Sequence, residues 1–169
     1  MLDDETSEAL AKAEIFSGLT PEEIKLFSQA VQRVTCEKGA MVIEKGQVGA
    51  ALYIILTGQF EVDLPLGVYI PQVVGGTVER RMSKVRLNAL RGGDCFGEYS
   101  VFDQQPPSAS VVATEAGELF KITGPAFEAI LQGNDRIAKT VYANMLRILI
   151  TRLRKLNVDW SQYLLNYGE

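Results

Sequence analysis

A Gly-Glu pair in the middle of the chain has the residue types that a phosphorylated sugar needs in its binding site. Gly97 has no side chain, so a ligand can approach its backbone closely. If a helical turn begins at Gly97–Glu98, the free N–H groups of that turn suit an anion. The Glu98 carboxylate can accept hydrogen bonds from sugar hydroxyls. A cyclic sugar phosphate needs both features, so this pair is the first candidate for a ligand site.

The pair lies in residues 94–115, which continue through an apolar turn, a Pro-Pro-Ser-Ala segment and a β-branched run. This stretch resembles the phosphate-binding cassette of the cyclic nucleotide-binding domain family. The cassette reads roughly F-G-E, an apolar turn, then P-R-x-A. Phe96-Gly97-Glu98 matches its opening, and Pro106 matches its proline. Where the family has the Arg that grips the cyclic phosphate, this chain has Pro107.

The resemblance implies a ligand-sensing regulatory module for cyclic AMP or cyclic GMP, which signals through a protein partner or through dimer geometry. In the family's bacterial regulators the long C-terminal helix meets the adenine near the position of Arg152. A solvated Arg is the alternative at that position. The ligand-binding residues that the resemblance implies are Phe96, Gly97, Glu98, Tyr99, Ser108, Ala109 and Arg152.

Pro107 keeps a second hypothesis open. Loss of an Arg–phosphate contact removes a strong charge-assisted bond, worth about 2–4 kcal/mol, or roughly 30- to 1000-fold in affinity. The chain is then a structural or interaction domain whose degenerate pocket binds no cyclic nucleotide.

The elements that position the cassette begin with helices in residues 1–30. A helix is expected over residues 3–13. Thr20 then caps a second helix, Pro21 suits its first position, and Glu23 completes a capping box. This second helix is predicted to run to about residue 30.

From Val31 the pattern changes to short strands separated by glycine turns. The resemblance implies an eight-stranded β-roll over residues 31–123, a jelly-roll-like double-stranded β-helix with flanking helices. Gly46, Gly49 and Gly58 fall at the family's spacing, although tight turns alone also explain them. The expected strands are residues 31–36, 40–44, 51–57, 59–64, 109–114 and 118–122.

Residues 65–91 are longer than the family's usual hairpin. Apolar residues at 68–70 and 77–78 flank Gly75-Gly76, which indicates an added hairpin. Its basic residues form either a solvated face or a partner site. They are Arg80, Arg81, Lys84 and Arg86.

C-terminal helices are predicted over residues 124–169, and the last begins near Asn134. It carries one apolar stripe at Ile137, Val141, Met145 and Ile148. A second stripe alternates steps of four and three, as in a heptad seam. Two stripes require two partners, so we expect a homodimer through this helix, with one broad buried face as the alternative. The seam comprises Tyr142, Leu146, Leu149, Leu153, Leu156, Trp160 and Tyr163.

Composition excludes several functional classes. The chain has no histidine, which excludes His-based triads and His metal sites, and no paired nucleophile and base or Walker-type loop is present, so we expect no enzyme activity. A net charge of −4 argues against general nucleic-acid binding. About a dozen residues follow Leu156, too few for a helix-turn-helix, so the sensor is expected to stand alone.

The cysteine spacing, the longest apolar run and the charge of the N-terminus predict the cellular compartment. Two cysteines give no disulfide framework or metal-site spacing. The longest apolar run, residues 50–56, is too short to span a membrane, and the N-terminus is acidic where a signal peptide is basic. A cytoplasmic protein without membrane or metal is therefore expected.

Overall fold

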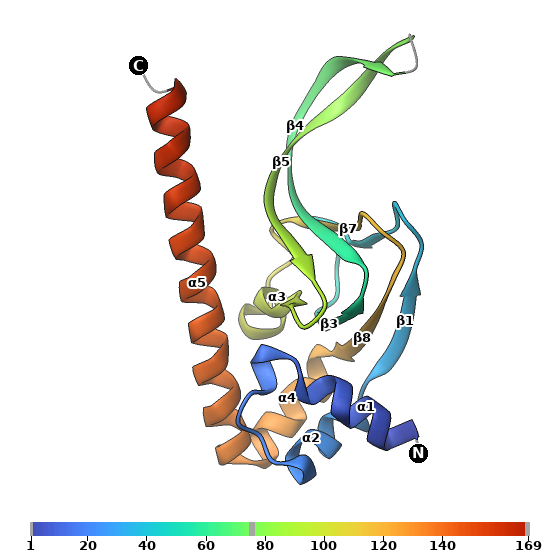
Figure 1. Cartoon of the computed structure of the whole chain (residues 1–169), viewed down its shortest axis with the longest axis vertical. Helices are drawn as coiled ribbons and strands as arrows, with labels where there is room; N and C mark the ends of the chain where they lie inside the picture. The colour runs from blue at the N-terminus through green and yellow to red at the C-terminus, as the bar shows by residue number, and fades with distance from the viewer. Residues whose placement is uncertain (1, 75–76, 168–169) are drawn as a thin grey trace. The chain divides into compact units, whose positions relative to one another are not determined.

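The structure, a computed structural model, describes residues 2–74 and 77–167 of the 169-residue chain (Figure 1). Contacts divide the chain into two compact units. One unit comprises Met1–Ala30 and Ala126–Glu169, and the other comprises Val31–Pro125. The first is helical and the second is built from β-sheets.

The helical unit begins with two helices and a short 3-10 turn. The capping box predicted at the start of α2 is present. The Thr20 backbone N–H donates to Glu23 Oε2 over 2.8 Å, and the Glu23 N–H donates to Thr20 Oγ1 over 3.3 Å. The helices are α1 (Leu2–Ala11), η1 (Glu14–Phe16), α2 (Pro21–Ser28), α4 (Gly124–Gly133) and α5 (Asp135–Tyr167).

Aromatic rings form the core of this unit. The Phe27 ring lies 4.5 Å from that of Phe16 and 5.8 Å from that of Phe127, measured between centroids. The buried Asn144 of α5 donates to the carbonyls of Ile15 and Ser17. The Asn144 side-chain amide therefore satisfies backbone acceptors in the segment before α2, and these bonds hold α5 against that segment.

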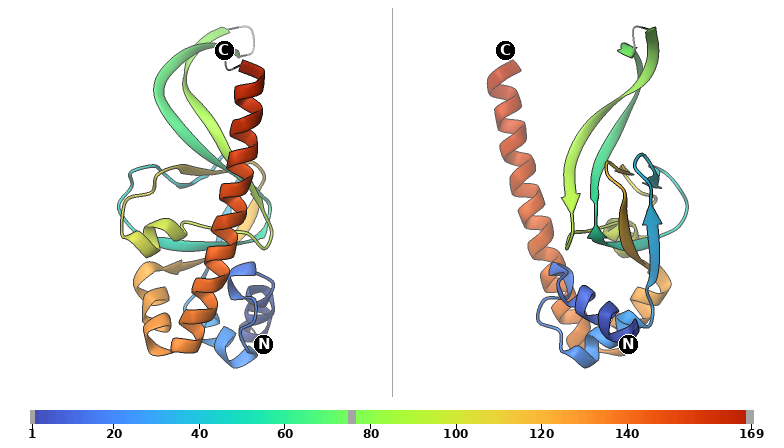
Figure 2. Two further views of the ribbon diagram at one scale, coloured as in Figure 1. Left: turned by 90° about the vertical axis from the view of Figure 1, so that its left-hand side faces the viewer. Right: turned by 45° about the vertical axis from the view of Figure 1, so that its right-hand side comes forward.

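Helix α5 is one continuous helix (Figure 2). Its two apolar stripes differ in burial. The first stripe, from Ile137 to Ile148, is buried, and none of its members is more than 6% exposed. Leu149 of the second stripe is half-buried, and the side chain of Tyr163 lies outside the described residues. The other members of that stripe are between 50% and 59% exposed: Tyr142, Leu146, Leu153, Leu156 and Trp160.

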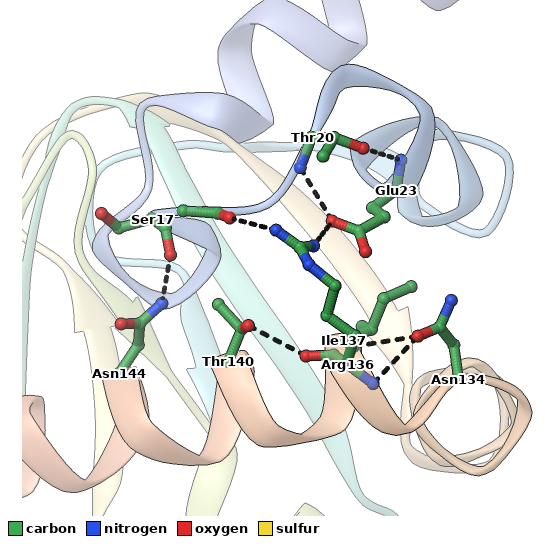
Figure 3. A network of polar contacts seen from close by, with 9 residues as sticks. Ser17, Thr20, Glu23, Asn134, Arg136, Ile137, Thr140 and Asn144 are labelled. Atoms are coloured by element: carbon green, nitrogen blue, oxygen red, sulfur yellow. Dashed lines mark hydrogen bonds and ion pairs between the residues drawn. The ribbon is translucent and has the colours of Figure 1, made fainter.

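A polar network centred on Arg136 joins the start of α5 to the start of α2 (Figure 3). The Arg136 guanidinium pairs with Glu23 and donates to the Gly18 carbonyl over 3.2 Å. Asn134 accepts from the backbone N–H groups of Arg136 and Ile137, so it caps α5. The Arg136 guanidinium is the largest cause that holds the pKa of Glu23 below its ordinary value.

Replacing Arg136 with Met should lower the free energy of unfolding by about 1 kcal/mol at neutral pH. A lowered pKa in the folded state gives stability that is present above the ordinary carboxyl pKa and is lost as pH falls through the lowered value. Urea unfolding measured from about pH 7 to about pH 3 should therefore show that the unfolding free energies of wild type and Arg136→Met become more similar in acid. Lys139→Met, which removes an exposed charge from the same helix, is the control. An unchanged difference at every pH would assign the effect to lost packing.

The second unit consists of two antiparallel four-stranded sheets among the described residues. Their strand orders are β1-β8-β3-β6 and β2-β7-β4-β5. A short helix, α3 (Glu98–Asp103), follows β6. The strands are β1 (Gln32–Cys36), β2 (Met41–Ile43), β3 (Ala51–Thr57), β4 (Gln59–Val74), β5 (Thr77–Arg91), β6 (Cys95–Phe96), β7 (Ser110–Ala113) and β8 (Gly117–Thr123).

The interior of this roll is apolar. Phe60 and Leu119 are fully buried at its centre, and the Phe60 and Phe96 rings lie 5.9 Å apart. Strands from both sheets contribute to this cluster. The predicted fold class, a mainly β roll with flanking helices and a long C-terminal helix, is confirmed.

The added hairpin is confirmed, and it is continuous with the roll. Strands β4 and β5 pair from Gln59↔Arg91 to Val74↔Thr77, with a bulge after Pro65, and the predicted turn at Gly75-Gly76 lies outside the described residues. Among the side chains that the structure describes, two basic residues of β5 pair with acids on β4. Lys84 pairs with Asp63, and Arg86 pairs with Glu61 over 2.6 Å.

No helix among the described residues has the length and the apolar content that a bilayer crossing requires.

Candidate functional site

The Gly-Glu pair lies where the last short strand of the roll turns into α3. Gly97 is the residue before the helix and has a φ of +82°. Glu98 opens α3 and is only 2% exposed. Gln104, with a φ of +56°, ends the helix. The predicted helical turn at Gly97–Glu98 is therefore present, with its acidic side chain inside the protein.

Packing alone already requires glycine at position 97. A Cβ atom there would lie 2.3 Å from the backbone oxygen of Ala51 and 3.3 Å from the Tyr53 ring. The positive φ adds strain for any residue with a side chain. The glycine thus lets the cassette backbone approach β3, whether or not a ligand is bound.

Replacing Gly97 with Ala should therefore destabilise the protein by about 2–4 kcal/mol, because the methyl group meets backbone atoms that cannot move aside. Gly39 is the matched control, since its φ is +88° and a Cβ atom there would meet nothing within 4 Å. We expect Gly39→Ala to cost only about 1 kcal/mol. Urea denaturation monitored by circular dichroism measures both, and equal losses would show that the close approach does not matter.

The loop after α3 is fastened to the turn that follows β2. The Pro107 carbonyl accepts a hydrogen bond from the Gly46 N–H over 2.9 Å. Three residues further on, the Ser110 hydroxyl accepts from the Lys45 N–H over 3.0 Å. These two bonds fix the part of the cassette that closes over a phosphate in the family pattern.

A pocket of about 270 Å³ opens between the cassette and the strands of the roll. We call it the Lys121 pocket after its charged residue. Backbone and side chains from β2, β3, β8 and the loop before β3 form its walls. Its lining residues are Val42, Ile43, Gln47, Val48, Gly49, Ala50, Ala51, Tyr53, Gly97, Ser100, Pro107, Lys121 and Thr123.

Lys121 is a polar residue of this pocket that the sequence analysis missed. It lies opposite Tyr53 in the pairing of β8 with β3, so both side chains stand on the same face of the sheet. Its Nζ lies 5.8 Å from the centroid of the Tyr53 ring. Alternation along β8 places residues 119, 121 and 123 on one face, a signal that the sequence does contain.

Of the residues expected to bind ligand, Gly97 lines the Lys121 pocket. Phe96 is buried and stacks on Tyr53, with centroids 5.0 Å apart. Tyr99 is 48% exposed, Ser108 is exposed and Ala109 is half-buried. Glu98 has interactions within the structure. Arg152 lies on α5 in the helical unit. Their roles toward a ligand remain predictions.

The chain was compared with known protein families. The family model for the cyclic nucleotide-binding domain matches residues 33–134. The chain belongs to the cyclic nucleotide-binding domain family. The match covers the roll, the cassette and α4, and it confirms the family expected from the F-G-E motif.

Relatives of the family include transcription regulators and kinase regulatory subunits. The Cyclic AMP receptor protein of Thermus thermophilus is 30% identical over 146 residues, which is 86% of this chain and 59% of that protein. A cyclic nucleotide-binding domain from Methylobacillus flagellatus has a TM-score of 0.69 at 21% identity, covering 91% of this chain and 79% of that one. The regulatory subunit of a cAMP-independent protein kinase A from Trypanosoma brucei has a TM-score of 0.68 at 21% identity, covering 97% and 52%.

The chain spans 59% of the length of the first curated relatives that it matches. Within that span it is a sensor domain of the cyclic nucleotide-binding type. Domains of this type are typically non-catalytic. Among the described residues there is no group of three or more His, Cys, Asp or Glu side chains arranged to hold a metal ion.

Proposed function

We propose that this domain senses a cyclic nucleotide, cyclic AMP or cyclic GMP, with low affinity and passes the signal to a protein partner or through the geometry of a dimer. The observation that carries the proposal is the retained cassette turn. Gly97 starts α3 in the left-handed conformation, Glu98 opens the helix inside the roll, and the loop carrying Pro107 is fastened over the same region. The names of relatives that match this chain include a cyclic AMP receptor.

In this proposal the ligand is held by Phe96, Gly97, Glu98, Tyr99, Ser108 and Ala109, and Arg152 stays a ligand residue that the family resemblance predicts. Glu98 accepts from the ribose hydroxyls, and the backbone near Gly97 donates to the phosphate. Pro107 supplies neither a positive charge nor an N–H. Binding is consequently expected to be weak, with a dissociation constant of about 100 μM or more, which corresponds to roughly −5.5 kcal/mol or less favourable.

An interaction domain that binds no cyclic nucleotide is the second candidate. The observation that favours it is the residue at position 107, because the family's phosphate-binding Arg is absent. A structural neighbour with the same fold is described as the regulatory subunit of a cAMP-independent kinase. The fold alone therefore does not imply binding of cyclic AMP.

The proposed output is a homodimer through α5. Five members of the heptad seam on this helix are at least 50% exposed, so a single chain presents an apolar stripe to solvent. The stripe follows heptad spacing, and a second copy of the same helix matches that spacing. A net charge of −4 supports protein partners rather than nucleic acid.

A reducing compartment such as the cytoplasm is the proposed location. Cys36 and Cys95 are both buried and form no disulfide. Burial also raises the pKa of the Cys36 thiol, which disfavours its reactive thiolate. These features are typical of structural cysteines in reduced proteins.

Isothermal titration calorimetry of the wild-type chain with cyclic AMP and with cyclic GMP tests the proposal. Measurable binding at about 100 μM or weaker supports it. Binding in the low micromolar range would mean that another cation replaces the family Arg, and Arg152→Ala is then the first variant to measure. An absence of binding to both nucleotides favours the interaction domain.

A further inference from the structure

The Lys121 pocket contains a positive charge that the protein does not neutralise. Among the described residues that line the pocket, Lys121 carries the charge and none is a carboxylate. Lys121 forms no ion pair with any residue that the structure describes, and its Nζ lies over the Tyr53 ring. An ammonium group in a concave site without a counter-ion attracts anions.

Two hydroxyl groups in the same pocket also lack protein partners. Ser100 is 4% exposed and Tyr53 is 9% exposed. Neither hydroxyl forms a hydrogen bond with the described part of the chain. Neither oxygen is among the fully buried polar atoms without a partner in the described residues, so both hydroxyls are accessible from solvent. Oxygen atoms of a bound molecule would accept from both hydroxyls.

The size and the walls of the pocket restrict what can bind there. Its volume of about 270 Å³ lies just below the range of typical small-molecule sites, which starts near 300 Å³. Val42, Ile43 and Val48 make part of the wall apolar. A compact molecule with an anionic group and a short carbon skeleton fits these dimensions better than a large one.

We propose that the Lys121 pocket binds a small molecule that carries a phosphate or carboxylate group and is about the size of a pentose phosphate. Lys121 is the counter-ion of that group, and Ser100 and Tyr53 donate hydrogen bonds to it. Glu98, Ser108 and Ala109 are not among the residues that line this pocket, so it differs from the proposed cyclic-nucleotide site. Gly97 and Pro107 do line it, so its occupant contacts the cassette directly.

The test uses the wild-type chain with two probes, ribose 5-phosphate and succinate, in NMR and calorimetric titrations. The two probes distinguish a phosphate ligand from a carboxylate ligand. We expect at least one to bind with a dissociation constant of about 1 mM or tighter. Lys121→Gln should weaken that binding by at least about tenfold, because a charge-assisted contact is lost.

Lys38→Gln is the matched control, since Lys38 is an exposed lysine between β1 and β2 on the same unit. Its affinity for the probe should equal that of the wild type. Lys121→Arg keeps the charge and should keep most of the binding. If Lys121→Gln does not fold, Ser100→Ala provides the same test, with an expected loss of about threefold to tenfold.

The outcomes separate this inference from the cyclic-nucleotide proposal. Failure of both probes to bind, or equal binding by wild type and Lys121→Gln, overturns the Lys121 pocket as an anion site. Cyclic AMP binding that is unchanged in Lys121→Gln supports the cassette site and does not rescue the pocket. Lys121-dependent binding of a probe without any cyclic-nucleotide binding establishes the pocket and refutes the proposed ligand.

Discussion

Replacing both Leu146 and Leu153 with Asp is expected to dissociate the proposed dimer into monomers. Both leucines lie on the heptad seam of α5 and are 59% and 58% exposed in the single chain. In a symmetric coiled coil each meets its counterpart on the second copy, so the double variant places four carboxylates in one apolar interface. Burying unpaired charges costs several kcal/mol, and we expect at least about a 1000-fold weaker association.

Sedimentation equilibrium over a range of protein concentrations measures this change. The control is Val158→Asp, which introduces the same charge on the same helix at a residue that is 55% exposed but lies off the seam. Its association should match that of the wild type. Circular dichroism checks that all variants retain the fold. A wild type that sediments as a monomer at every concentration would remove the dimer from the proposed function.

The burial of the two apolar stripes of α5 supports a partner for the seam. The first stripe of α5, which includes Ile137 and Val141, is fully buried within the helical unit. The seam extends beyond the end of the first stripe. Its member Trp160 is 59% exposed, and the residues next to Trp160 along α5 are exposed as well. A helix that docks only on its own unit has no need for apolar residues there.

Local signals made the helices and most strands predictable. Thr20, Pro21 and Glu23 identify the start of α2 without any tertiary information, and the capping box forms as expected. The helix that contains the seam has no Pro or Gly to interrupt it, so its length follows from the sequence. Glycine turns and β-branched runs likewise delimit β3 and β7 closely.

The long hairpin was harder to delimit because its signals conflict. Pro65 cannot donate to a ladder, so the sequence predicts a strand end near residue 64. In the structure β4 continues to Val74, because a bulge after Pro65 accommodates the missing N–H. Burial of Asp63 was also unpredicted. Its Oδ2 pairs with Lys84, while its Oδ1 has no hydrogen-bond partner among the described residues.

One part of the candidate site could be predicted from the sequence and another part could not. Phe96-Gly97-Glu98 is contiguous, so a motif reveals it and the resemblance gives its family. Lys121 joins Gly97 in one pocket only because β8 pairs with β3 and β3 pairs with β6. That relation depends on strand order, which a single sequence does not contain. Motif reading therefore found the cassette and missed the charge next to it.

Replacing Pro107 with Arg should tighten the binding of cyclic AMP or cyclic GMP by at least about tenfold, or about 1.4 kcal/mol. The substitution restores the family residue on the same loop. Pro107 contributes its carbonyl to Gly46, and any residue at this position retains a carbonyl, so the loop stays fastened. The new guanidinium supplies the countercharge that the cyclic phosphate lacks in the wild type.

Pro106→Arg is the matched control, because it adds the same charge one residue away from the family position. Its affinity should stay close to that of the wild type. Adding Glu98→Gln to Pro107→Arg should reverse most of the gain, since an amide is a weaker acceptor for the ribose hydroxyls than a carboxylate. The gain should also persist in a Lys121→Gln background, because Lys121 is not among the residues proposed to hold the cyclic nucleotide.

Two results of the calorimetric titrations would count against this account. Equal affinities for Pro107→Arg and wild type would mean that the cassette is closed or shaped for another ligand, and the interaction domain would become the better hypothesis. An equal gain from Pro106→Arg would mean that added positive charge attracts the nucleotide without a specific contact. Such nonspecific attraction would be recognised because the gain in affinity disappears at about 0.5 M salt. Screening by salt weakens long-range attraction more than it weakens a direct ion pair.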